Sequence, residues 1–105
     1  MNYKINTVYV VMHDHYKIVW NQMGQGQTEG GYTHISRIFA TREEAEKYIV
    51  ELRDEYRNGN LYHKNELTMD IWTPDRYCLG YILERSAGTY TEQRIDYELQ
   101  EIVLE

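Results

Sequence analysis

Two histidines and a carboxylate stand together at His13-Asp14-His15, residue types that serve as metal ligands. Imidazole and carboxylate groups bind Zn²⁺ and related ions. Residues two apart on a strand share a face, so His13 and His15 could chelate one ion, with further ligands from His34 or His63. Because the chain has no Cys-x-x-Cys or His-Glu-x-x-His pattern, we favour polar residues at a strand end, and we predict no metal and no cofactor.

Nucleophilic catalysis would fall to Cys78, Ser36 or Ser86, and none of these lies in a recognisable nucleophile motif. Cys78 stands inside an apolar run, where a thiol is usually an inert core residue without an activating charge. We therefore predict a protein that is not an enzyme and has no catalytic residues.

A polar, glycine-rich stretch runs from residue 21 to residue 31 and includes Gly24 and Gly26. It matches neither a Gly-x-Gly-x-x-Gly nor a Walker pattern, and no helix follows it directly, so it is not a phosphate-binding loop. We expect a mobile loop that either connects strands or becomes ordered when it meets a partner. An alternative hypothesis is a small-molecule or nucleotide site, in which this loop closes over a ligand beside Trp20 and Trp72.

The charge balance argues against direct binding of nucleic acid. Seventeen acidic residues face eleven Lys and Arg, giving a formal net charge of −6, whereas affinity for phosphates comes mainly from basic side chains. Eleven tyrosines against one phenylalanine suit half-buried sheet faces and protein interfaces, because tyrosine keeps a hydroxyl at the boundary with water. The candidate binding residues are aromatic or acidic side chains, together with the two glycines named above: Tyr32, Trp20, Trp72, Glu92, Asp96 and Glu98.

The elements that must position these residues are organised around one helix. Thr41 followed by Glu44 forms a capping box, and apolar residues then recur at spacings of three and four up to Tyr56. Asn58-Gly59 is a stop signal. The spacing predicts an amphipathic helix over about 42–57, with Ala45, Tyr48, Ile49, Leu52 and Tyr56 on its apolar stripe.

Strand patterns flank this helix on both sides. They cover residues 5–12, 16–20 as a separate strand or a continuation, 32–39, 67–72, 77–84 and 89–104. In the last strand the apolar parity switches at Glu101, which predicts a bulge or bend there. We predict a single domain over 1–105 with an α+β fold, a mostly antiparallel sheet of four to six strands with one helix on one face.

Two segments carry a resemblance to known proteins. Tyr9-Val10-Val11-Met12-His13 and the junction from Ile35 to Glu46 resemble a group of small bacterial and phage domains of unknown function. Their strand reads Tyr-Val-x-x-His and their junction reads Ile-Gly-x-Phe-Ser-Thr-x-Glu-Glu-Ala, with Ser36 here in place of the glycine. The match covers about half of the chain. The resemblance implies an α+β fold and a bacterial or mobile-element origin, and it implies no biochemical activity.

A single helix shields only one face of a sheet, so the other face must be polar, covered, or offered to a partner. We expect an acidic interaction module, phage or mobile-element encoded, that acts by binding a host protein, for example a basic nucleic-acid-handling protein. Inhibition of that protein is one outcome of such binding. A homodimer would satisfy the same surface. We expect no membrane span, because the sequence has no run of about 18 apolar residues. We expect a cytoplasmic protein, because the start of the chain lacks the apolar core of a signal peptide and one cysteine cannot form an internal disulfide.

Overall fold

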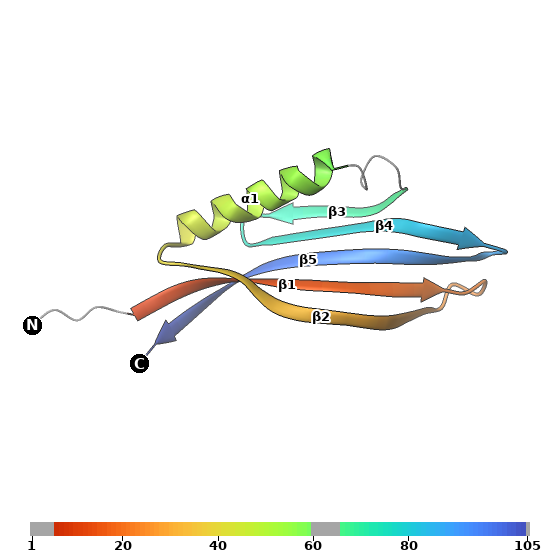
Figure 1. Cartoon of the computed structure of the whole chain (residues 1–105), viewed down its shortest axis with the longest axis horizontal. Coiled ribbons are helices and arrows are strands. Elements are labelled where there is room, and N and C mark those ends of the chain that lie inside the picture. The colour runs from red at the N-terminus through yellow and green to blue at the C-terminus, as the bar shows by residue number, and fades with distance from the viewer. Residues whose placement is uncertain (1–5, 60–65, 105) are drawn as a thin grey trace, which may run out of the picture.

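The computed structural model describes residues 6–59 and 66–104, which form an α+β fold (Figure 1). The predicted fold class is confirmed. Five strands make one sheet in the order β2-β1-β5-β4-β3, with every neighbouring pair antiparallel. In chain order the elements are β1 (Asn6–Trp20), β2 (Gly26–Phe39), α1 (Arg42–Asn58), β3 (Leu67–Thr73), β4 (Arg76–Ser86) and β5 (Thr89–Leu104).

The helix begins where the sequence predicts. The Thr41 hydroxyl accepts a hydrogen bond from the backbone N–H of Glu44 at 3.3 Å and donates one to the Glu44 carboxylate at 2.9 Å. This is an N-cap, although the Glu44 side chain pairs with the hydroxyl of Thr41 instead of its backbone N–H. At the other end Gly59 has an extended backbone with φ −75°, and its N–H donates to the carbonyl of Tyr56.

The core lies between the helix and one face of the sheet. Ala45 and Ile49 are fully buried, and Tyr48, Leu52 and Tyr56 pack at the edges of the same cluster, which confirms the predicted stripe. Alternate residues of three neighbouring strands meet the helix, because side chains along a strand point to opposite faces. These residues are Val11, Tyr77, Leu79, Tyr81, Ile95, Tyr97 and Leu99.

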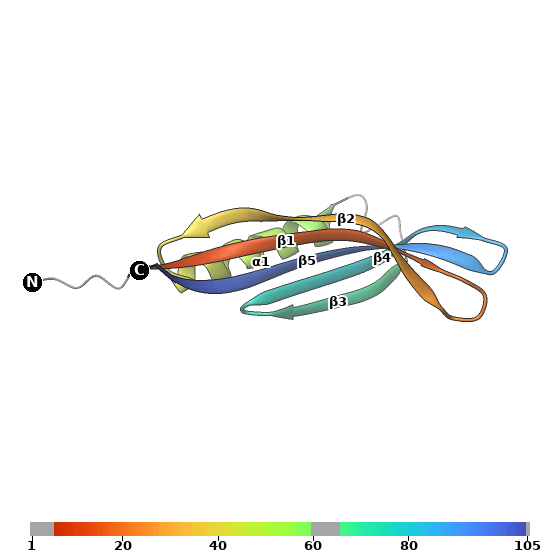
Figure 2. The same ribbon diagram turned by 90° about the horizontal axis from the view of Figure 1, so that it is seen from below.

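The sheet is much longer than the helix that packs on it. Strands β1 and β5 have 15 and 16 residues, which corresponds to about 50 Å at 3.3 Å per residue. The helix has 17 residues, about 25 Å at 1.5 Å per residue. In Figure 2 the sheet lies in front of α1, and the β1–β2 and β4–β5 hairpins continue past the end of the helix. Half of one face and all of the other therefore lie outside its cover.

Residues 16–20 continue β1, the second of the two alternatives that the sequence pattern left open. Two other local predictions differ from the structure. The stretch predicted as a loop over 21–31 is a short turn up to Gln25, and from Gly26 onward it belongs to β2. Of the bulge or bend expected at Glu101, the bulge is absent from the β1–β5 pairing, whose register runs unbroken from Leu104 to Tyr90.

The turn between β1 and β2 is fixed by one side chain. The amide oxygen of Asn21 accepts hydrogen bonds from the backbone N–H groups of Met23 and Gln25, at 2.9 and 3.0 Å. Such side-chain contacts replace backbone ones in tight turns. Within residues 6–59 and 66–104, no helix combines the length and apolar character that crossing a membrane requires.

Candidate functional site

The face of the sheet turned away from α1, here called the open face, carries exposed apolar side chains. Ile35, Ile38 and Ile71 are each 54% exposed, and Ile102 is 39% exposed. The strand register places all four on this face, because Ile35 pairs with Met12, Ile38 with Val10, Ile71 with Cys78, and Ile102 with Val8. In the described part of the chain nothing covers them, since the only helix there packs on the opposite face. Ile35 and Ile38 lie on edge strand β2 and Ile71 on the opposite edge strand β3, so the face has separate apolar parts. Exposed apolar surface on one face of a protein is a common feature of interaction sites.

A charged band crosses the open face between its apolar parts. Asp14 of β1 lies opposite Asp96 of β5, and Glu98 lies opposite Arg76 of β4. Asp96 accepts a hydrogen bond from the hydroxyl of Tyr16 at 3.3 Å. The carboxylates Asp14, Asp96 and Glu98 outnumber Arg76, and Arg94 is already paired elsewhere, so the band has an excess of negative charge.

The band borders a shallow hollow of about 230 Å³ on the open face. Its walls include Ile71 and Met69 on the apolar side and Asp96, Arg76 and Arg94 on the charged side, with Cys78 also lining it. The Cys78 side chain is only 5% exposed. Burial and a hydrogen bond to Asp96 raise the pKa of this thiol to about 11, so it is not an activated nucleophile.

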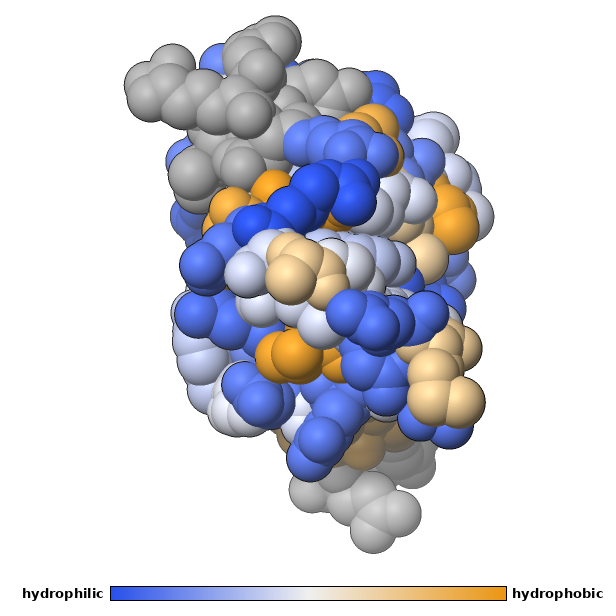
Figure 3. All heavy atoms as spheres, turned by 90° about the vertical axis from the view of Figure 1, so that its right-hand side faces the viewer, coloured by the Kyte–Doolittle hydropathy of each residue, from blue (hydrophilic) through white to orange (hydrophobic). Residues whose placement is uncertain are grey.

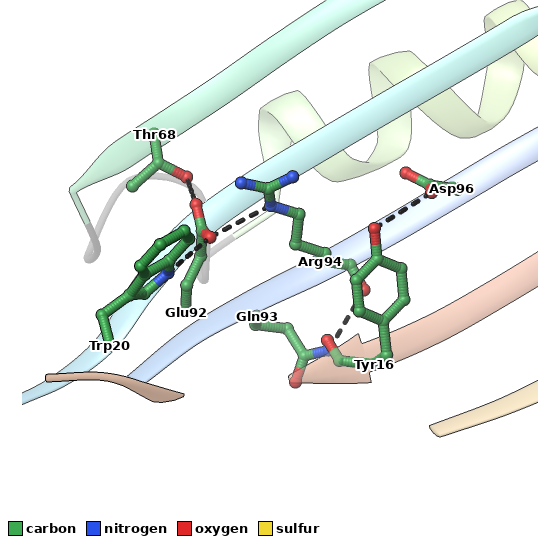
Figure 4. A network of polar contacts seen from close by, with 7 residues as sticks. All are labelled: Tyr16, Trp20, Thr68, Glu92, Gln93, Arg94 and Asp96. Atoms are coloured by element: carbon green, nitrogen blue, oxygen red, sulfur yellow. Dashed lines mark hydrogen bonds and ion pairs between the residues drawn. The ribbon is translucent and has the colours of Figure 1, made fainter. Parts of the chain in front are cut away.

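Beyond the band, a buried carboxylate ties three strands together (Figure 4). Glu92 is 2% exposed and accepts hydrogen bonds from Nε1 of Trp20 at 3.1 Å and from Nε of Arg94 at 3.0 Å, as well as from the hydroxyl of Thr68. Gly80 leaves the room for this contact, because a Cβ there would lie 3.1 Å from the carboxylate and 2.6 Å from the Thr68 hydroxyl. The sequence analysis named Glu92 as a candidate binding residue, and in the structure its carboxylate is buried among these contacts.

A second cluster lies on the helix side of the sheet, among strands β1 and β2. His13 and His15 alternate along β1, and the register sets His34 opposite His13 and Tyr32 opposite His15. We call these four residues the histidine cluster. The rings of His13 and His34 are 4.7 Å apart between centroids, and those of His13 and His15 are 5.5 Å apart. The hydroxyl of Tyr32 lies 3.0 Å from Nδ1 of His15.

The histidines of this cluster differ in burial. His13 is 7% exposed and stacks on Tyr97 with 4.4 Å between ring centroids, whereas His34 is exposed. Burial, followed by the neighbouring imidazoles of His34 and His15, lowers the pKa of His13 to about 4. Burial also lowers the pKa of His15. The buried Nε2 of His13 has no hydrogen-bond partner, and such a group costs about 1–3 kcal/mol of folding stability.

The histidine cluster borders a hollow of about 430 Å³ at the edge of the sheet. Gly30 and Gly31 of β2 have φ values of +59° and +110° and form a bulge, at which the register shifts between His15 and Lys17. A Cβ on Gly31 would lie 2.9 Å from Cβ of Tyr16. The glycines predicted to belong to a loop therefore shape a strand edge, and the hollow lies beside them.

The structure separates residues that the sequence analysis grouped. Trp20 lies on the open face beside Tyr90, whereas Trp72 lies on the helix face under the guanidinium of Arg53. The two indoles therefore cannot flank one ligand. Gly24 lies in the β1–β2 turn with φ +77°, and Gly26 packs against the ring of Trp20. That end of the molecule is mainly hydrophilic, with apolar atoms only in small separate patches (Figure 3).

Sequence reasoning missed the residues that make the open face apolar. Ile35, Ile38 and Ile71 were treated as ordinary strand residues, because a strand pattern alone does not say which face a helix covers. The position of His34 beside His13 depends on a register with bulges. For the metal question, no group of three or more His, Cys, Asp or Glu side chains within residues 6–59 and 66–104 is placed so that it could hold a metal ion.

Comparison of this chain with protein-family models, curated proteins and solved structures finds no match. No family is assigned to it on this basis. The function is therefore argued from the surfaces described above.

Proposed function

We propose that this protein acts by binding another protein through the open face of its sheet. The observation that carries the proposal is the set of exposed isoleucines, Ile35, Ile38, Ile71 and Ile102, on the face that α1 leaves uncovered. Burying such side chains against a partner is favourable at about 25 cal/mol for each Å² of apolar surface. A protein that keeps several of them on one face gains most by covering that face.

The open face is large enough for a specific interface. Five strands spaced about 4.8 Å apart, with the longest about 50 Å long, present on the order of 1,000 Å² on one side. A stable protein–protein interface needs roughly 800 Å² from each partner. Most of the open face would therefore belong to the interface. The isoleucines would contact the partner, and the charged band would cross the same interface.

The charge of the band indicates the chemistry of the partner. Asp14, Asp96 and Glu98 place carboxylates between the apolar parts, and the whole chain has a formal net charge of −6. A partner surface with apolar residues around Lys or Arg side chains would match this arrangement, whereas an acidic surface would be repelled. The partner we propose is therefore a protein with a basic, partly apolar surface, and binding would block that surface.

The experiment compares the two faces of one protein. A photo-crosslinking amino acid is placed at Ile71 on the open face or at Glu51 on the exposed side of the helix, and each variant is irradiated in lysate of the source cells. We expect a crosslinked protein from position 71 and none of it from position 51. The Ile38→Lys/Ile102→Lys variant should lose this product, while Glu51→Lys should retain it.

Three results would overturn the proposal. One is the same set of products from both positions, because the contact would then not belong to the open face. Another is a product at position 71 that the double lysine variant keeps. The third is a crosslink only to a second copy of this chain, accompanied by a dimer in light scattering, which would assign the open face to self-association.

A further inference from the structure

Strand β2 forms an open edge of the sheet. It has 14 residues, pairs with β1 on its inner side, and is exposed along residues 26–35. Among the described residues no strand pairs with its outer side. Such an edge presents unpaired backbone N–H and C=O groups, to which a further strand can add. The edge is therefore a candidate contact that is separate from the open face.

Two bulges interrupt β2 at equal distances from Thr33. Residues 30–31 oppose one residue of β1, and so do residues 35–36. A bulge usually discourages pairing, because the extra residue puts the side chains beyond it on the wrong face of an added strand. A second copy of β2, running antiparallel and centred on Thr33, carries its bulges in matching positions, since residue 30 meets residue 36 and residue 31 meets residue 35. Side chains beyond the bulges then keep their faces.

The charges of β2 fit the same arrangement. With histidine neutral, Glu29 and Arg37 are the charged residues of this strand, and they lie equally far from Thr33 in sequence. Both project from the helix side of the sheet, because their β1 partners Lys17 and Val11 share one face and Val11 belongs to the core. In the antiparallel pair each Glu29 would lie opposite Arg37 of the other copy. The strand itself carries no net charge, so two acidic chains would meet where their charges balance.

The same register pairs aromatic rings and keeps the helices apart. Tyr32 of each copy would lie opposite His34 of the other, and both residues are exposed on the helix side. Cross-strand aromatic pairs of this kind stabilise a sheet. Helix α1 lies over the half of the sheet near Phe39, and the β1–β2 hairpin that contains Gly26 extends past it (Figure 2). Antiparallel pairing therefore sets the helix of one copy beside the bare half of the other.

We propose that this chain forms a symmetric dimer by antiparallel pairing of its two β2 strands about Thr33. The two sheets would join into one, with both helices on one side and both open faces on the other. The proposal goes beyond the binding of a partner through the open face. It does not depend on that binding, because the edge backbone of β2 is distinct from the side chains of the open face.

The contact would be modest in area. Residues 27–39 of each copy would pair over about 40 Å at 3.3 Å per residue, and a sheet about 10 Å thick would then bury roughly 400 Å² from each copy. A stable interface needs roughly 800 Å² from each partner. We therefore expect a dimer that dissociates on dilution.

The first test exchanges charges. In sedimentation velocity the full chain should change from monomer to dimer between about 5 and 500 μM. Arg37→Glu and Glu29→Arg should each weaken dimerisation roughly tenfold, because like charges would face each other twice. An equimolar mixture of these two variants should dimerise again, since unlike charges meet at both positions. Arg85→Glu, the matched charge change on β4, should dimerise as the unaltered chain does.

The second test locates the symmetry axis. Thr33→Cys should form a disulfide between copies on mild oxidation, because directly opposed Cα atoms lie about 4.5–5.5 Å apart, within the range of a disulfide. Thr28→Cys is the control, since it is exposed on the same strand but would lie about 33 Å from its counterpart. The native Cys78 is 5% exposed and should not react. Circular dichroism verifies that all variants are folded.

A monomer across the whole concentration range would overturn the proposal, and an edge that takes a strand of another protein instead would give that result. So would a mixture of the two charge variants that stays monomeric. Disulfides that form equally well from positions 28 and 33 would also contradict it, because the copies would then have no fixed register.

Discussion

Lowering the pH from 7 to 5 should destabilise the protein, because folding holds His13 in its neutral form. Burial and the nearby imidazoles of His34 and His15 lower its pKa from 6.5 to about 4, while Asp14 acts in the opposite direction. An unfolded chain takes up this proton below pH 6.5, whereas the folded chain resists it until about pH 4. The unfolded state therefore binds more protons between these values, and stability falls as the pH falls.

The size of the effect follows from the two pKa values. Their difference, at 1.36 kcal/mol per pKa unit, limits the loss to about 3 kcal/mol below pH 4. Only part of it, about 1–2 kcal/mol, develops between pH 7 and pH 5, and the pKa of about 4 already includes the opposing contribution of Asp14. His13 is 7% exposed, so solvent screens the effect little.

The assay is urea unfolding followed by circular dichroism at pH 7 and pH 5. His13→Phe is the matched control, since it keeps the ring that stacks on Tyr97 and cannot titrate. Protonation of carboxylates affects both proteins alike, so the expected result is a loss of stability in the unaltered chain that exceeds the loss in His13→Phe by about 1–2 kcal/mol. Equal pH dependence of the two proteins, or an NMR titration of His13 near pH 6.5, would refute the reasoning.

Three further predictions concern single residues. Gly31→Ala should lower the free energy of unfolding in urea by about 2–3 kcal/mol, because φ is +110° and the added Cβ would meet Tyr16. Gly30→Ala, whose added Cβ would have nothing within 4 Å, should lower it by only about 1 kcal/mol. Equal losses in the two variants would contradict this reasoning. Glu92→Gln should cost about 2 kcal/mol through its buried hydrogen bonds, and a neutral result would show that the network is not stabilising. Cys78 should react with iodoacetamide at pH 8 roughly a hundredfold more slowly in the folded chain than in urea, since burial raises its pKa to about 11; equal rates would contradict its burial.

The sequence predicts those parts of the fold that depend on local signals. The capping residue Thr41 and the 3–4 spacing that follows it define α1 to within one residue at its end. The alternation from Thr89 onward gives both ends of β5. In each case the relevant contacts join residues close in sequence or follow a simple period, so they can be found without a three-dimensional arrangement.

The sequence does not predict features that depend on pairing between strands. Gly30 and Gly31 have the composition of a loop, yet their positive φ values serve a bulge that β1 stabilises by hydrogen bonding along the strand. The buried position of Glu92 depends on the space at Gly80, a residue from another strand. Which apolar residues are exposed on the open face likewise depends on the side of the sheet against which α1 packs. Strand alternation divides residues between two faces but does not indicate which face the helix covers.

The histidine cluster lies between these two cases. The sequence showed that His13 and His15 share a face, and it named His34 among two further candidates. The pairing of His34 with His13 depends on the strand register. Ser36 forms a bulge between Ile35 and Arg37, which shifts the β1–β2 pairing by one residue and places His34 opposite His13.

The most direct test of the central claim is crosslinking from the open face. A photoreactive residue at Ile71 should capture a protein with a basic, partly apolar surface, and the same residue at Glu51 should not capture it. The capture should weaken as salt is added, because the carboxylates of Asp14, Asp96 and Glu98 would contribute to binding. A product that forms equally from both positions would contradict the account.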